Sequence, residues 1–159
     1  MKRYYLAYGS NLDVRQMRWR CPTAKVIGTG TIPGYELLYK GSQTGAYLTI
    51  EMKEGGSVPV AVWEVTDRDE RSLDRYEGFP NFYYKKELKL PVTLHSGKVK
   101  KLPTFVYIMH EERKLGIPSP AYIRTCRFGY TVFGFDFKYL DDAYDRSVKG
   151  TCVHLRKEI

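Results

Sequence analysis

The segment Tyr8-Gly9-Ser10-Asn11-Leu12 lies where a predicted strand meets a predicted helix, and such a junction suits anion binding. Gly9 allows a sharp turn and a close approach of the backbone to a ligand. The unpaired amides of the first helical turn would then converge on one point, at the positive end of the helix dipole. A carboxylate or a developing oxyanion fits that point. The alternative is structural: Gly9 makes an ordinary turn, and Ser10 or Asn11 only caps the helix.

Glu77 is the second candidate, because it ends a predicted helix in the sequence LDRYEGFP, residues 73–80. The negative end of the helix dipole disfavours a carboxylate at that position. This placement, together with desolvation by neighbouring aromatic residues, would raise the pKa of Glu77 toward neutrality, as a general acid/base requires. The alternative is a solvated glutamate that precedes a glycine C-cap.

Other chemistry finds little support in the residue pattern. The three histidines, His95, His110 and His154, are scattered over predicted turns, strand ends and the tail, so we expect neither a metal cluster nor a histidine-centred triad. Ser10 lacks the Gly-x-Ser-x-Gly elbow, and no cysteine carries the flanking signature of a catalytic thiol. No phosphate-binding or dinucleotide-binding glycine motif is present either. The sequence therefore predicts no metal and no organic cofactor.

The elements that would position these residues are mainly strands. Short runs rich in β-branched and aromatic residues are separated by Gly or Pro, as at Pro33-Gly34 and Gly55-Gly56. Leu88, Leu90, Val92 and Leu94 alternate, which predicts one buried face in a hairpin that turns at residues 95–97. The predicted strands are 3–8, 24–29, 35–39, 46–51, 58–65, 84–94 and 98–109.

Four helices are expected. The first spans residues 12–21, with Ser10 or Asn11 as its cap, and stops at Pro22. The second runs from Asp67 to about Tyr76, opens on a capping box of Thr66 and Asp69, and buries Leu73 and Tyr76. The remaining two are predicted at residues 121–129, opened by Ser119-Pro120, and at 137–149. Strands interspersed with few helices indicate an α+β fold on a mixed or closed sheet.

Composition sets the broad class of the protein. A chain of 159 residues with 43% hydrophobic and 28% charged residues fits one globular domain, residues 1–159. No apolar run reaches the ~18 residues needed to cross a bilayer, and no signal peptide is evident, so we expect a cytoplasmic protein without membrane association. Three cysteines, an odd number, predict reduced thiols rather than disulfides.

The net charge of +8 raises the question of nucleic acid as a partner. The longest purely basic runs have two residues, as at Lys85-Lys86 and Lys100-Lys101, and the cations are interspersed with acids. A solvated basic surface that attracts small anions explains this pattern better than nucleic-acid binding as the main role.

Taken together, four motifs resemble the gamma-glutamylcyclotransferase family over about residues 4 to 125. They are Tyr8-Gly9-Ser10-Asn11-Leu12, Leu73-Asp74-x-x-Glu77-Gly78, Tyr83-Tyr84 and Pro118-Ser119-Pro120-x-Tyr122. Each motif is weak alone, but their order and spacing together are specific. The resemblance implies a small mixed β-barrel with surrounding helices, and an enzyme that releases 5-oxoproline and a free amine from a gamma-glutamyl amide by cleaving a C–N bond.

The resemblance also implies roles for particular residues. Glu77 is expected to be the acid/base catalyst, and the loop of Tyr8, Gly9, Ser10, Asn11 and Leu12 to bind the glutamyl head of the substrate. Tyr122 and Tyr84, or Tyr83 if the register shifts by one, match tyrosines of the family's substrate pocket.

The leaving amine stays open at this point. Gamma-glutamyl amino acids, gamma-glutamyl-lysine and gamma-glutamyl protecting groups of antibiotic biosynthesis all fit the same head site. Aromatic residues beside Glu77 suggest a mouth that accepts an alkyl or cationic amine. Two other functions remain as alternatives: a small-molecule binder without turnover on the same fold, and a basic module associated with nucleic acid.

Overall fold

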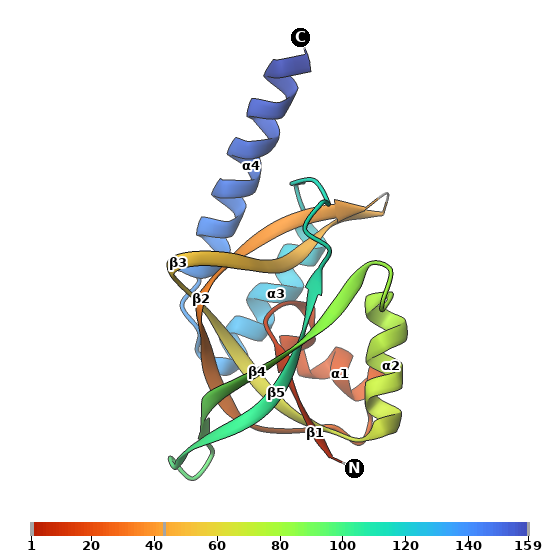
Figure 1. The fold of residues 1–159 in the computed structure, drawn as a ribbon, viewed down its shortest axis with the longest axis vertical. Coiled ribbons are helices and arrows are strands. Elements are labelled where there is room, and N and C mark those ends of the chain that lie inside the picture. The colour runs from red at the N-terminus through yellow and green to blue at the C-terminus, as the bar shows by residue number, and fades with distance from the viewer. Residues whose placement is uncertain (1, 43, 159) are drawn as a thin grey trace.

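The computed structural model describes residues 2–42 and 44–158, with side chains up to residue 151. Five strands form a closed barrel in the order β1-β3-β2-β4-β5, and helices pack around it (Figure 1). The strands are β1 (Arg3–Ala7), β2 (Lys25–Ser42), β3 (Gly45–Val65), β4 (Tyr83–Leu94) and β5 (Val99–Met109).

The barrel is mixed, as the sequence predicted. β1 pairs antiparallel with β3, and it closes the barrel through a parallel pairing with β5 in which Tyr5 lies opposite Phe105. The β4–β5 hairpin confirms the predicted alternation, since Leu90 and Val92 are buried between exposed neighbours. The α+β fold class is therefore confirmed.

One long hairpin replaces four predicted strands. Residues 24–29 and 35–39 belong to the single strand β2, and residues 46–51 and 58–65 belong to β3. Pro33-Gly34 and Gly55-Gly56, which predicted turns, instead lie at an irregularity where the register shifts between Pro33 and Tyr35. Pairing resumes on both sides of this irregularity, because each half of the hairpin still buries an apolar face in the barrel.

The first predicted helix is divided in two. A 3₁₀ turn, η1 (Ser10–Leu12), precedes α1 (Val14–Arg20). The cap of α1 is Asp13, whose carboxylate accepts a hydrogen bond from the Arg15 amide at 3.0 Å, and not Ser10 or Asn11 as expected. Ser10 and Asn11 are consequently free to face another part of the molecule.

Two C-terminal helices pack on the outside of the barrel, one against the 3₁₀ turn and the other against β2. They are α3 (Pro120–Phe133), which Ser119 caps as predicted, and α4 (Lys138–Glu158), which continues past the barrel (Figure 1). Both exceed their predicted lengths. Gly129 does not end α3, because it lies inside the helix where a Cβ would overlap Leu12 of the 3₁₀ turn. Among the described residues, no helix is both long and apolar enough to span a membrane.

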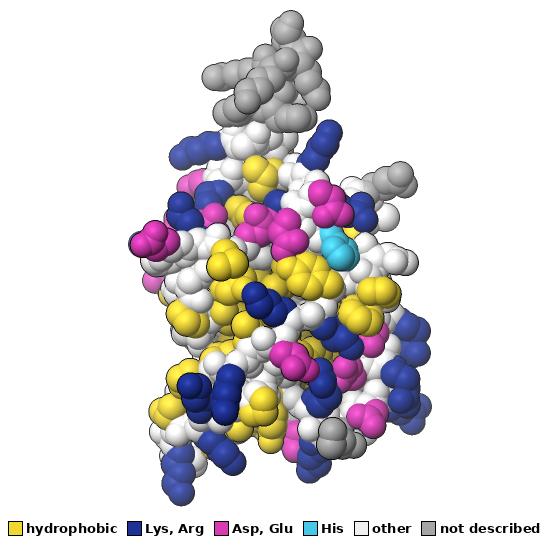
Figure 2. Space-filling view, in the orientation of Figure 1, with side chains coloured by type: hydrophobic (Ala, Val, Ile, Leu, Met, Phe, Trp, Pro, Cys, Tyr) yellow, Lys and Arg dark blue, Asp and Glu magenta, His cyan; other side chains and the backbone are white. Residues whose placement is uncertain are grey.

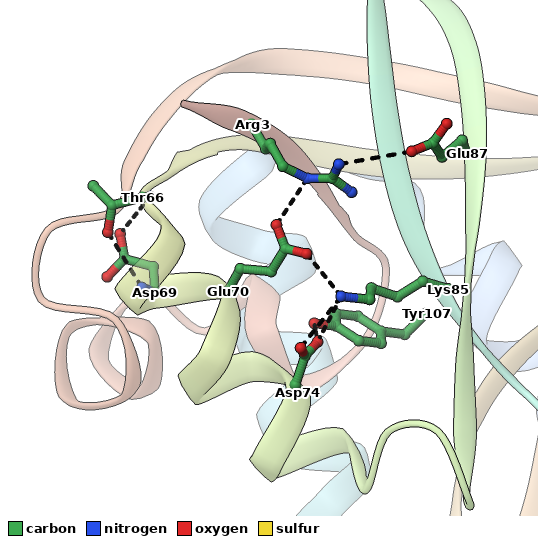
Figure 3. Close-up of polar contacts among 8 residues, drawn as sticks. All are labelled: Arg3, Thr66, Asp69, Glu70, Asp74, Lys85, Glu87 and Tyr107. Carbon is green, nitrogen blue, oxygen red and sulfur yellow. Dashed lines mark hydrogen bonds and ion pairs between the residues drawn. The ribbon is translucent and has the colours of Figure 1, made fainter. Parts of the chain in front are cut away.

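α2 (Asp67–Glu77) is held against the barrel by charged groups. The predicted capping box is present: Thr66 and Asp69 each bind the other's backbone amide. Farther along, the Lys85 ammonium of β4 contacts Glu70 at 2.7 Å and Asp74 at 3.0 Å (Figure 3).

Two further strands join this network. Arg3 of β1 lies 2.8 Å from Glu70, and the Tyr107 hydroxyl of β5 donates to Asp74 at 2.6 Å. Three strands thus fix one face of α2, and with it the position of the helix's last residue.

Replacing Lys85 tests this attachment. Lys85→Met should lower the free energy of unfolding by about 2 kcal/mol, because it leaves the largely buried Asp74 carboxylate without a cation and Glu70 with Arg3 alone. Urea denaturation at neutral pH measures the effect. Lys89→Met is the matched control on the same strand, where an exposed lysine should contribute less than about 0.5 kcal/mol. Equal stabilities of the two variants would contradict the role given to Lys85.

Candidate active site

A cavity of about 410 Å³ opens where the loop after β1 meets the end of α2. Its walls are rich in hydroxyl groups, and Arg75 and Glu77 are the only charged side chains among the described residues that line it. The tyrosines among the lining residues are Tyr5, Tyr8, Tyr47, Tyr76, Tyr83, Tyr107 and Tyr122. The remaining lining residues are Leu6, Gly9, Ser10, Asn11, Ser42, Thr44, Leu48, Gly78 and Phe82.

Glu77 is the last residue of α2, as the sequence predicted. Gly78 follows as the C-cap in a left-handed conformation, with φ of 63°. The Glu77 side chain is partly buried and has no hydrogen bond or salt bridge to any described residue. Burial raises the pKa of Glu77 from 4.5 to about 7, although the charge of Arg20 opposes the rise. At neutral pH this carboxyl group can therefore either accept or donate a proton.

The loop at residues 8–12 brings backbone amides to the same cavity. Leu12 and Asp13 donate their amides to the carbonyls of Gly9 and Ser10, each at 3.0 Å. The amides of Ser10 and Asn11 open the 3₁₀ turn, and within the described part of the chain they have no partner. Two uncommitted donors thus lie in the segment for which the sequence predicted an anion site.

Gly9 is required for space. Its φ is −127°, so the turn does not use the left-handed region that favours glycine. A Cβ at this position would lie 3.3 Å from the Tyr122 hydroxyl and 3.5 Å from the Leu48 Cβ. A side chain on Gly9 would therefore press against two walls of the cavity.

Arg20 connects the loop to the end of α2. Its guanidinium group hydrogen-bonds the side-chain oxygen of Asn11 and stacks on the ring of Tyr76, 3.3 Å from the ring centroid. Asn11 also donates to the Tyr5 hydroxyl at 2.9 Å, and Ser10 and Tyr76 share a hydrogen bond of 3.2 Å. The expectation that Tyr76 is buried in the core is wrong: its ring is 46% exposed and forms a wall of the cavity.

Tyr83 and Tyr122 bind opposite polar groups of the same residue. The Tyr83 hydroxyl donates to the Leu48 carbonyl at 2.8 Å, and the Leu48 amide donates to the Tyr122 hydroxyl at 3.0 Å. Both tyrosines line the cavity. Leu48 lies on β3 opposite Tyr39 of β2. The two hydroxyls therefore satisfy the backbone amide and carbonyl of Leu48 on the side away from β2.

Two expected residues lie outside the cavity. Leu12 is fully buried beneath Gly129 of α3, because the 3₁₀ turn directs it into the core. Tyr84 lies on the other face of β4 from Tyr83, and its hydroxyl donates to Glu111. Of the two candidates on this strand, Tyr83 is therefore the one that lines the cavity.

Burial keeps the cavity tyrosines protonated. It raises the pKa of Tyr5, Tyr8, Tyr83 and Tyr122 well above the usual value of 10, and the charge of Glu77 raises the first three further. Their hydroxyls are already used in part, since Tyr8 donates to the Tyr107 carbonyl at 2.7 Å. They are neutral hydrogen-bonding groups, and Glu77 is the cavity residue whose pKa lies near 7.

Tyr5, Tyr47, Tyr107 and Arg75 also line the cavity, and they were not predicted from the sequence. One signal was available for the tyrosines. The chain has 14 of them, and a buried tyrosine needs a partner for its hydroxyl, so tyrosines on the inner face of a small barrel indicate a polar interior. No group of three or more metal-ligating side chains occurs among the residues that the structure describes.

Comparison with known proteins gives a consistent result. Residues 5–124 match the family model described as gamma-glutamyl cyclotransferase, AIG2-like. Two proteins named gamma-glutamylcyclotransferase, from Bos taurus and Homo sapiens, are each 28% identical over 142 residues, covering 85% of this chain and 73% of the relative. A solved structure named gamma-glutamyl cyclotransferase superposes with a TM-score of 0.77 at 26% identity, covering 90% of this chain and 86% of the other. The chain therefore belongs to the gamma-glutamyl cyclotransferase, AIG2-like, family.

Proposed function

We propose that this protein is a cyclotransferase that converts a gamma-glutamyl amide or gamma-glutamyl amino acid into 5-oxoproline and a free amine, with Glu77 as general acid/base. The observation that carries the proposal is Glu77 itself. Its carboxyl group lines the hydroxyl-rich cavity, has no partner among the described residues, and has a pKa near 7. Family membership supports the same reaction.

The substrate supplies its own nucleophile in this reaction. Its α-amino nitrogen attacks the γ-carbonyl carbon, a five-membered ring closes, and the bond from that carbon to the leaving nitrogen breaks. Because the attack is intramolecular, the protein's first task is to hold the glutamyl head in a curled conformation. Positioning of this kind can lower the barrier by roughly 7 to 11 kcal/mol.

Glu77 would carry the proton between the two nitrogens. As a carboxylate it accepts a proton from the α-ammonium group, which makes the amine nucleophilic. As a carboxylic acid it then donates that proton to the departing nitrogen. A pKa of about 7 suits both steps, since neither protonation state is rare at physiological pH.

The loop amides would hold the negative charge of the substrate. The free amides of Ser10 and Asn11 fit the α-carboxylate or the oxyanion that forms on the γ-carbonyl oxygen. Further neutral hydrogen-bonding groups around the glutamyl head come from the side chains of Tyr8, Ser10, Asn11, Tyr83 and Tyr122. The reaction needs no covalent enzyme intermediate, because the substrate's own α-amino group is the nucleophile.

We also propose that the enzyme acts in the cytoplasm. Cys21 and Cys126 are buried free thiols, which is usual for a reducing compartment. Burial raises the pKa of each thiol to about 12, so neither serves as a nucleophile in this mechanism.

Substitution of Glu77 tests the mechanism. Glu77→Gln keeps the size of the side chain and its hydrogen-bonding capacity but cannot transfer a proton, so 5-oxoproline release should fall at least ~10²-fold. The thermal shift produced by 5-oxoproline should persist. Glu54→Gln makes the same chemical change at an exposed position and should leave activity unchanged. Full activity in a folded Glu77→Gln protein would remove Glu77 from the mechanism.

The pH dependence of stability gives a second test. Because folding raises the pKa of Glu77, the folded state binds its proton more tightly than the unfolded state does. Stability is therefore lost as the pH rises from about 4.5 to about 7, and Glu77→Gln, which cannot ionise, escapes this loss. Between pH 5 and pH 8 the variant should gain about 2 to 3 kcal/mol over the wild type in urea denaturation. A constant difference across this range would contradict the raised pKa.

A further inference from the structure

Apart from the exposed Asp67, which opens the helix, the charges of α2 are divided between two faces. Arg68, Arg71 and Arg75 are exposed, and their spacing places them within a sector of about 60°. We call these three residues the α2 arginine stripe. The acids farther round the helix point toward the barrel or the cavity: Asp69, Glu70, Asp74 and Glu77.

The inward acids do not neutralise the stripe, because other groups already occupy them. Glu70 and Asp74 share the Lys85 ammonium, as Figure 3 shows. Asp69 accepts hydrogen bonds from Thr23 and from the Thr66 amide.

The arginines of the stripe have no such partners. Among the described residues, Arg68 and Arg71 have no hydrogen bond or salt bridge, and Arg75 only donates to the Ser72 hydroxyl at 3.4 Å. Their guanidinium groups are therefore available to a ligand.

The stripe ends at the cavity. Arg75, two residues before Glu77, is the only cationic side chain among the described residues that line the cavity. Arg71 and Arg68 continue from it along the outer surface, and Figure 2 shows Lys and Arg side chains along the outer edge of α2. A substrate whose glutamyl head is bound at Glu77 would extend its leaving group past this row of positive charge.

We propose that the preferred substrates are gamma-glutamyl compounds whose leaving amine carries two or more carboxylates, such as an acidic amino acid or a short gamma-glutamyl peptide. This inference rests on the proposed function and specifies its substrate. Arg75 binds the side-chain carboxylate that distinguishes an acidic leaving amino acid from a neutral one, and Arg71 binds the next carboxylate in a longer leaving group. This proposal replaces the expectation, drawn from the sequence, that the cavity accepts an alkyl or cationic amine, because the positive charge at the cavity is that of Arg75.

Guanidinium groups suit this task for a physical reason. They bind carboxylates through paired hydrogen bonds, and a row of them attracts a polyanion over distances of about one Debye length. They would repel a leaving group with a net positive charge. The selectivity should accordingly weaken as salt is added.

The test compares gamma-glutamyl-glutamate with gamma-glutamyl-glutamine, whose leaving groups have the same shape but differ by one carboxylate. We expect kcat/KM to be about three- to tenfold higher for the glutamate compound, mainly through KM, at about 20 mM NaCl. Arg75→Gln should reduce this ratio to near one, whereas Lys100→Gln, which removes one charge in the distant β4–β5 hairpin, should leave it unchanged. About 300 mM NaCl should lower the ratio in the wild type.

A longer substrate tests the outer part of the stripe. Gamma-glutamyl-gamma-glutamyl-glutamate adds one carboxylate to the leaving group and should raise kcat/KM further, and Arg71→Gln should abolish that increment. A wild-type ratio near one, or a ratio unaffected by Arg75→Gln, would overturn the inference while 5-oxoproline release still supports the proposed function. Absence of 5-oxoproline from every substrate would overturn the proposed function and the inference together.

Discussion

The candidate site depends on the pair of salt bridges that the Lys85 ammonium makes with Glu70 and Asp74. It fixes α2 against β4, while Arg3 and Tyr107 attach the same carboxylates to β1 and β5. These contacts hold the last residue of the helix at the cavity. A carboxylate there lies at the unfavourable end of the helix dipole. The ion pairs thus stabilise a helix whose C-terminus is locally destabilised by Glu77.

Most polar groups that line the cavity already have hydrogen-bond partners within the protein. Tyr8, Tyr83 and Tyr122 bind backbone groups of the barrel, and Asn11 is held between Tyr5 and Arg20. What remains without a partner among the described residues is the Glu77 carboxyl group and the amides at the start of the 3₁₀ turn. The paired groups are thus held in place, and the groups without a partner can hydrogen-bond or exchange a proton with a ligand.

Features set by local rules could be predicted from the sequence. The Thr66–Asp69 capping box, the Gly78 C-cap and the alternation in β4 all follow from neighbouring residues, and they locate Glu77 at a helix end. The barrel as a fold class also followed, through the order of strands and helices and the resemblance of the motifs to a known family.

Features that depend on packing could not be predicted in the same way. Tyr83 and Tyr84 point to opposite faces of one strand, so a register shift of one residue exchanges them. Leu12 enters the core only because α3 has a glycine opposite it, and Pro33-Gly34 remains within a strand only because both flanking segments pair with β3. Arg75 becomes a cavity residue through the position of α2, which no local pattern specifies.

The proposed reaction depends on the protonation of Glu77, and NMR titration of its side-chain carboxyl carbon measures that protonation directly. The Glu77→Gln spectrum identifies the resonance, and selective labelling of glutamate at the carboxyl position makes it observable. We expect a titration midpoint of about 7, well above the ordinary value of 4.5. A midpoint near 4.5 would show a solvated carboxylate at the end of α2, and would contradict its assignment as the acid/base of the site.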